Sequence, residues 1–163
     1  MPGFLFGKIA TLAIIMKTLI LSIIFCCSVC AAFCQRIIIK YGTESTYTLA
    51  KGPDKKFNLT LVDTKTLSGD VGLTNDFLKS DVDSTQIKFV FGGNKKDNLS
   101  EVFLIMKTSR KGMIKYTAKI KAPGASGFVN SDVNMIIGTV KTVEMWQDDI
   151  AEIMLTDFEE GSF

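Results

Sequence analysis

Apolar and polar side chains alternate with a period of two along much of this chain. Over 114–121, Ile114, Tyr116, Ala118 and Ile120 alternate with Lys115, Thr117, Lys119 and Lys121. Successive side chains of a β-strand point to opposite faces, so this order predicts a strand with one buried face. Further strands are predicted over 36–41, 46–50, 57–61, 87–91, 134–140, 141–146 and 150–158. The apolar run 102–106 predicts a strand covered on both faces, near the centre of its sheet.

Turn-forming residues separate these segments. The turn at 109–112, with Gly112 at its end, predicts a hairpin that joins 102–108 to 113–121. The segment 71–80 predicts the one short helix, with Thr74 as its N-cap. About seven to nine short strands favour an all-β fold, an antiparallel β-sandwich, with a small β-barrel as the alternative. No repeat or linker divides residues 35–163, which are therefore predicted to form a single domain.

All four cysteines lie in the apolar N-terminal segment that ends at Cys34. Met16 and Lys17, the apolar stretch after them and small residues before position 35 fit an export signal. We therefore expect translation to start at Met16 and residues 1–34 to be absent from the mature protein. The mature chain would begin at Gln35, which can then cyclise to pyroglutamate, and would have 129 of the 163 residues.

Two alternatives to cleavage remain. Residues 9–34 form a stretch of 26 residues with Lys17 as its one charge, long enough for an uncleaved membrane anchor. Membrane contact is expected only in that case. Lipid attachment at Cys34 is the less favoured alternative, because the bulky Phe33 precedes it. Cleavage predicts an exported protein of a bacterial periplasm, outer cell surface or medium.

The predicted mature chain is formally neutral. Loss of Lys8 and Lys17 leaves 17 basic and 17 acidic residues. Recognition of a nucleic-acid backbone normally requires a one-sided positive field, so nucleic acid is not an expected partner. At this length one domain can bury a sufficient core without disulfides.

Residues 35–163 contain neither cysteine nor histidine. Serine and cysteine nucleophiles normally rely on an adjacent base, most often histidine, and zinc sites are built largely from Cys and His. These chemistries are therefore disfavoured. A pair of carboxylates could still hydrolyse a glycan, but the sequence distinguishes no such pair, and no catalytic residue is predicted.

Calcium is the only candidate cofactor, because it takes oxygen ligands. Asp81 and Asp83 place carboxylates close together on a predicted loop. The competing interpretation, which we favour, is that these residues simply form turns.

Trp146 is the single tryptophan and is followed by Gln147, Asp148 and Asp149. An exposed indole beside amide and carboxylate groups can hold a sugar ring or another ligand, so these four residues are the candidate binding site. The alternative, again favoured, is that Trp146 closes one end of the core.

These observations predict an exported, non-catalytic binding or assembly module, whose partner is an envelope or extracellular polymer or protein. A carboxylate-dependent hydrolase of glycans is one alternative. A carrier of lipids or small molecules is the other, and would require a barrel with an internal cavity.

Overall fold

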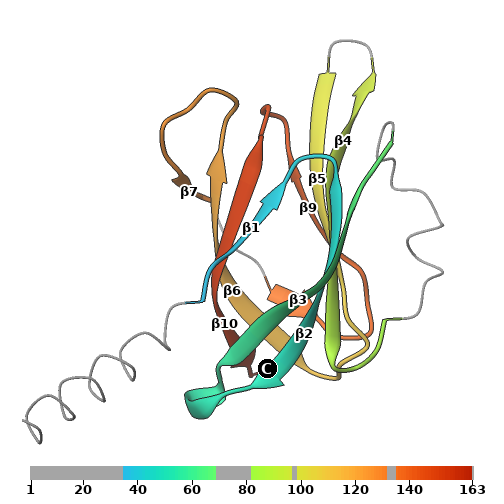
Figure 1. Ribbon diagram of the computed structural model, residues 1–163, viewed down its shortest axis with the longest axis vertical. Helices are drawn as coiled ribbons and strands as arrows, with labels where there is room; N and C mark the ends of the chain where they lie inside the picture. The colour runs from blue at the N-terminus through green and yellow to red at the C-terminus, as the bar shows by residue number, and fades with distance from the viewer. Residues whose placement is uncertain (1–34, 69–81, 97–98, 132–134, 163) are drawn as a thin grey trace, which may run out of the picture. The chain divides into compact units, whose positions relative to one another are not determined.

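Two antiparallel β-sheets face each other in the computed structural model (Figure 1), which describes residues 35–68, 82–96, 99–131 and 135–162. Sheet A has the order β1-β10-β6-β7, and β8 also pairs with β6. Its strands are β1 (Ile37–Lys40), β10 (Glu152–Gly161), β6 (Met113–Lys121), β7 (Val129–Ser131) and β8 (Met135–Ile137). Sheet B has the order β3-β2-β4-β5-β9. Its strands are β3 (Phe57–Thr66), β2 (Thr43–Lys51), β4 (Gln86–Lys96), β5 (Leu99–Lys107) and β9 (Thr142–Trp146).

The all-β, antiparallel architecture confirms the predicted fold class. One of the two sheets also curls into a half-barrel, so the fold has some of the curvature of the barrel alternative. The described chain has five strands in each sheet, slightly more than the seven to nine expected. β7 accounts for the difference, because a strand of three residues is too short to show a period of two, whereas β8 lies within the predicted strand 134–140.

The predicted hairpin between 102–108 and 113–121 is wrong. β5 pairs with β4 and β9 in sheet B, whereas β6 pairs with β10, β7 and β8 in sheet A. The segment 108–112 therefore crosses from one sheet to the other. It is held by backbone hydrogen bonds from Gly138 N to Gly112 O (2.8 Å) and from Thr139 N to Thr108 O (3.0 Å). Contacts with a distant turn, rather than local turn chemistry, direct the chain here.

The chain also changes sheets between β1 and β2, at Tyr41 and Gly42. Tyr41 N donates to Ala151 O, just before β10, and Gly42 N donates to Phe91 O on β4, both at 2.9 Å. Gly42 has a φ of +75°, a left-handed conformation that glycine adopts without steric cost. One short corner thus joins the first strands of the two sheets.

Alternating side chains of both sheets fill the space between them. The core includes Ile39, Leu59, Phe89, Phe91, Leu104, Ile114, Ile153 and Leu155. β5 is buried on both faces, as predicted, although β4 and not β5 occupies the centre of sheet B. The second face of β5 contributes Phe103 and Ile105 to a smaller apolar cluster with Val90. Leu67 packs against this cluster.

A β-bulge at Asp157 changes which side chains of β10 face inward. The register with β6 shifts between Thr156 and Glu159, and Asp157 has a left-handed φ of 56°. Ile153 and Leu155 point into the core before the bulge, and Phe158 does so after it. Because alternation resumes from Phe158, Glu160 also lies on the inner side of sheet A.

Two of the lysines of β6 lie opposite glutamates of β10. Lys121 lies opposite Glu152 and Lys115 lies opposite Glu159 on β10. The Lys121 Nζ is 3.5 Å from a Glu152 carboxylate oxygen. Such partly exposed pairs contribute only about 0.2–1 kcal/mol each, so they tune the pairing of β6 with β10 and do not determine it.

Two predictions fall outside the described residues, namely the N-terminal signal or anchor at 1–34 and the helix at 71–80. Within the described ranges, no helix combines the length and hydropathy needed to cross a bilayer. The single helical element there is the 3-10 turn η1 (Pro53–Lys55) between β2 and β3.

Candidate functional site

Exposed apolar side chains follow one edge of the sandwich. Five large ones lie on β8, on β9 and on the turn between them, a set that we call the β8–β9 surface: Met135, Ile137, Val140, Val143 and Met145. A hydrogen bond from Ile137 N to Thr142 Oγ1 links the two strands at 3.4 Å. Single exposed apolar residues are normal on a protein surface, but a concentration of them indicates an interaction site.

Strand alternation in β9 produces part of this surface. Glu144 and Trp146 point toward the core, opposite Leu104 and Val102 on β5. Val143 and Met145 therefore point outward, opposite Ile105 and Phe103. Met145 is 59% exposed and Val143 is 37% exposed. In sheet B, β9 pairs with β5 alone among the described strands, so it is an edge strand.

The inward side chains of β9 connect sheet B to sheet A. The Tyr116 hydroxyl donates to Glu144 Oε1 at 3.2 Å, and Trp146 Nε1 donates to Ser131 Oγ at 3.2 Å. Burial, together with the negative charge of Glu144, raises the pKa of Tyr116. At neutral pH Tyr116 is thus a neutral donor to a carboxylate, which fixes β9 against β6.

The four predicted binding residues are divided between two environments. Trp146 is half-buried at the end of β9 and packs against the main core, whereas Gln147, Asp148 and Asp149 are exposed in the connection to β10. Packing of the indole accords with the favoured alternative that Trp146 closes one end of the core. The exposed amide of Gln147 and the carboxylates of Asp148 and Asp149 lie on the same connection, next to the indole of Trp146, which is only partly exposed.

Of the two candidate calcium ligands, Asp83 lies within the described residues and Asp81 lies outside them. Asp83 is exposed, and its Oδ1 accepts hydrogen bonds from the Thr85 backbone N and Oγ1, both at 2.7 Å. These two bonds lower the pKa of Asp83. This geometry is that of a side chain stabilising its own turn. Across the described ranges, no three acidic, cysteine or histidine residues group as metal ligands.

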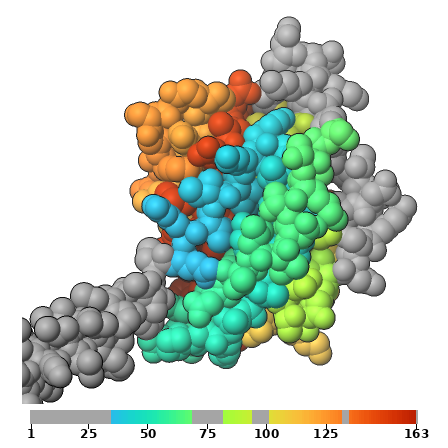
Figure 2. Space-filling view, viewed as in Figure 1, coloured from blue at the N-terminus to red at the C-terminus, as the bar shows by residue number. Residues whose placement is uncertain are grey.

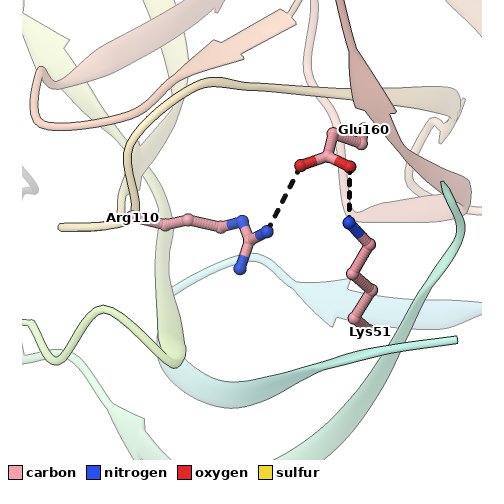
Figure 3. Close-up of polar contacts among 3 residues, drawn as sticks. All are labelled: Lys51, Arg110 and Glu160. Carbon is pink, nitrogen blue, oxygen red and sulfur yellow. Dashed lines mark hydrogen bonds and ion pairs between the residues drawn. The ribbon is translucent and has the colours of Figure 1, made fainter.

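A second polar cluster lies at the end of the sandwich where β2 and β10 finish (Figure 3). Glu160 accepts from Lys51 Nζ at 2.9 Å and from Arg110 at 3.4 Å. These contacts, that of Lys51 foremost, lower the pKa of Glu160. The Arg110 guanidinium also lies 4.7 Å from the centre of the Phe57 ring. Because Lys51 ends a strand of sheet B and Glu160 belongs to sheet A, the cluster joins the sheets.

The chain matches no protein-family model, no curated protein and no solved structure. The candidate site therefore rests on the geometry of the described residues. Sequence reasoning missed the β8–β9 surface, although the alternation in Val143, Glu144, Met145 and Trp146 carried part of the signal. What the sequence lacked was the direction: only the pairing with β5 shows that Val143 and Met145 are the outward pair.

Proposed function

We propose that this chain is an exported, non-catalytic binding or assembly module whose β8–β9 surface docks a protein partner in the cell envelope or outside the cell. The observation that carries the proposal is the succession of five exposed apolar side chains from Met135 to Met145. Burial of apolar area is the main favourable term in protein association. Lys141, in the turn between β8 and β9, would supply part of the polar rim that such interfaces have.

The core and the charged cluster at Glu160 both have a structural role, which leaves the β8–β9 surface as the candidate for an interaction with a partner. The space between the sheets is occupied by one continuous apolar cluster. The Lys51, Arg110 and Glu160 side chains satisfy one another, so this charged cluster is explained by contact between the sheets. Met145, by contrast, contributes nothing to the core and leaves most of its thioether side chain in water, and methionine adapts well to a partner surface.

Site-specific crosslinking in the native host tests the docking surface. A photoreactive amino acid replaces Met145 in one variant and Ile38 in another; Ile38 is a matched control because it is 44% exposed on β1. The proposal expects a discrete crosslinked partner from position 145 and none from position 38. The same product from both positions, or no product from position 145, would contradict it.

Affinity for the crosslinked partner then gives a quantitative test. Met145→Asp and Val143→Asp should each weaken binding by about tenfold or more, because each places a charge in a desolvated contact. Ile38→Asp should leave the affinity unchanged. All three sites are exposed, so thermal unfolding should stay close to that of the wild type, which separates lost binding from lost structure.

A further inference from the structure

The side chain of Gln35 pairs with the backbone of Leu59 on β3. Gln35 Nε2 donates to Leu59 O, and Gln35 Oε1 accepts from Leu59 N. Both backbone groups of Leu59 therefore point away from β2. Leu49, which lies opposite Leu59, likewise directs its N–H away from β3, to Thr85 O on the other side of β2. The carboxamide thus occupies the position that one residue of a further strand would take.

This contact lies on an edge of sheet B. Among the described strands β3 pairs with β2 alone, and Figure 2 shows the start of the described chain and β1 on the same face as the β2–β3 ribbon. Two and three residues after Leu59 on β3, the side chains of Leu61 and Val62 are 54% and 53% exposed. An edge with unpaired backbone groups beside exposed apolar side chains is a template for pairing with another strand. Gln35 caps this edge at Leu59.

We propose that Gln35 is a modification site at which cyclisation to pyroglutamate removes the cap from the β3 edge. This inference rests on the proposed export, because cyclisation requires the free α-amine that cleavage before Gln35 creates. The α-amine nitrogen attacks Cδ, the bond from Cδ to Nε2 breaks, and the nitrogen leaves as ammonia. The lactam forms without any oxidant or reductant.

The leaving nitrogen is the atom that donates to Leu59 O. Cyclisation therefore deletes this hydrogen bond, and closure of the ring ties Cδ to the main-chain nitrogen of residue 35. The carbonyl that accepted from Leu59 N is withdrawn with it. Conversely, the folded contact holds the carboxamide on β3 and away from the α-amine, so folding slows the reaction.

Hydrogen exchange at the Leu59 amide tests the cap. The protein is purified from its host, and the open-chain and cyclised forms, which differ in mass by one ammonia, are compared with Gln35→Ala. Exchange at Leu59 should be about tenfold faster in the cyclised form and in Gln35→Ala than in the open-chain form, because in neither does Gln35 Oε1 accept a hydrogen bond from Leu59 N. The Leu49 amide, bonded to Thr85, is the internal reference and should be unchanged.

The rate of ammonia loss provides the second measurement. Open-chain protein should cyclise about tenfold more slowly when folded than in urea, because the contact with Leu59 must open first. Equal rates in the two states, or equal Leu59 exchange in all three forms, would overturn the inference while leaving export intact. A host protein that retains residues before Gln35 would overturn both, since its Gln35 has no free α-amine.

Discussion

The ring of Phe158 stacks on that of Tyr116, with centroids 5.9 Å apart and planes inclined by 25°. Phe158 also meets Phe89 of sheet B edge-on at 6.4 Å. These contacts depend on the bulge at Asp157, because in a regular β10 the side chain after Leu155 to turn inward would be that of residue 157. One left-handed residue therefore places an aromatic ring between the two sheets.

Substitutions at Asp157 should separate backbone strain from packing. Asp157→Gly, which adopts the left-handed conformation freely, should change the free energy of unfolding by less than about 1 kcal/mol. Asp157→Val should destabilise the protein by about 1–2 kcal/mol, because a β-branched residue resists a positive φ. Deletion of Asp157 removes the extra residue and places Phe158 directly after Thr156, where a regular strand points inward, so it should cost less than the about 3–5 kcal/mol of losing a buried phenylalanine. Urea unfolding measures all three, and equal stability of the glycine and valine variants would contradict this account of the bulge.

Gly138 should not tolerate a side chain. A Cβ at this position would lie 1.6 Å from Arg110 O and 2.9 Å from Gly112 O. Gly138→Ala should therefore detach the β8–β9 turn from the crossing segment and destabilise the protein by at least about 2 kcal/mol. Gly127→Ala is the matched control, because its Cβ would meet nothing within 4 Å. Thermal unfolding of the two variants gives the comparison, and similar melting temperatures would contradict the predicted clash.

The Glu160 cluster should contribute to stability in a pH-dependent way. Its contacts with Lys51 and Arg110 lower the folded-state pKa of Glu160 below the ordinary value of 4.5. The stabilisation is therefore complete above pH 4.5 and is lost as the pH falls through the folded-state pKa. Glu160→Gln should melt at a lower temperature than the wild type at pH 7, and this difference should shrink on acidification below pH 4.5. Glu101→Gln, at an exposed position of β5, controls for the loss of one negative charge. A difference that stays constant down to acid pH would argue against the cluster.

Tyr116 should make the stability of the fold depend on pH in the alkaline range. Burial and Glu144 raise its folded-state pKa above the ordinary 10.0, so its contribution is complete below pH 10 and is lost as the pH rises beyond that value. Tyr116→Phe should be less stable than the wild type at neutral pH by about 0.5–1.5 kcal/mol, through loss of the hydrogen bond to Glu144. Above pH 10 this difference should narrow or reverse, as followed by circular dichroism. A stability difference between the two proteins that stays constant through pH 10 would contradict this role of Tyr116.

The sequence predicted those elements whose burial is set by local alternation. β6 has one buried and one wet face, so the order from Ile114 to Lys121 sufficed to identify it. The apolar run of β5 likewise predicted burial on both faces. The hairpin after β5 could not be excluded locally, because the contacts that direct 108–112 across the sandwich come from Gly138 and Thr139. The bulge at Asp157 is visible in the sequence only as a change of apolar spacing from two to three between Leu155 and Phe158, within a segment predicted as one strand.

The candidate site was less predictable than the fold for a related reason. Trp146 was a candidate binding residue because it is the single tryptophan, yet its indole packs against the core. The outward position of Met145 follows from its register with Phe103, which is a long-range property. Residue type alone therefore indicated the end of β9, whereas the exposed face of this strand follows only from its pairing with β5.

The partnership of β1 with β10 determines when the fold can be completed. The four residues of β1 pair with the segment from Glu152 to Leu155, close to the end of the chain. A ribosome that delivers the N-terminus first thus releases β1 long before its neighbour exists, and sheet A cannot close until residues 152–155 have also emerged. Such widely separated pairing slows folding. The strand β1 therefore has to stay unpaired while the strands between it and β10 are made.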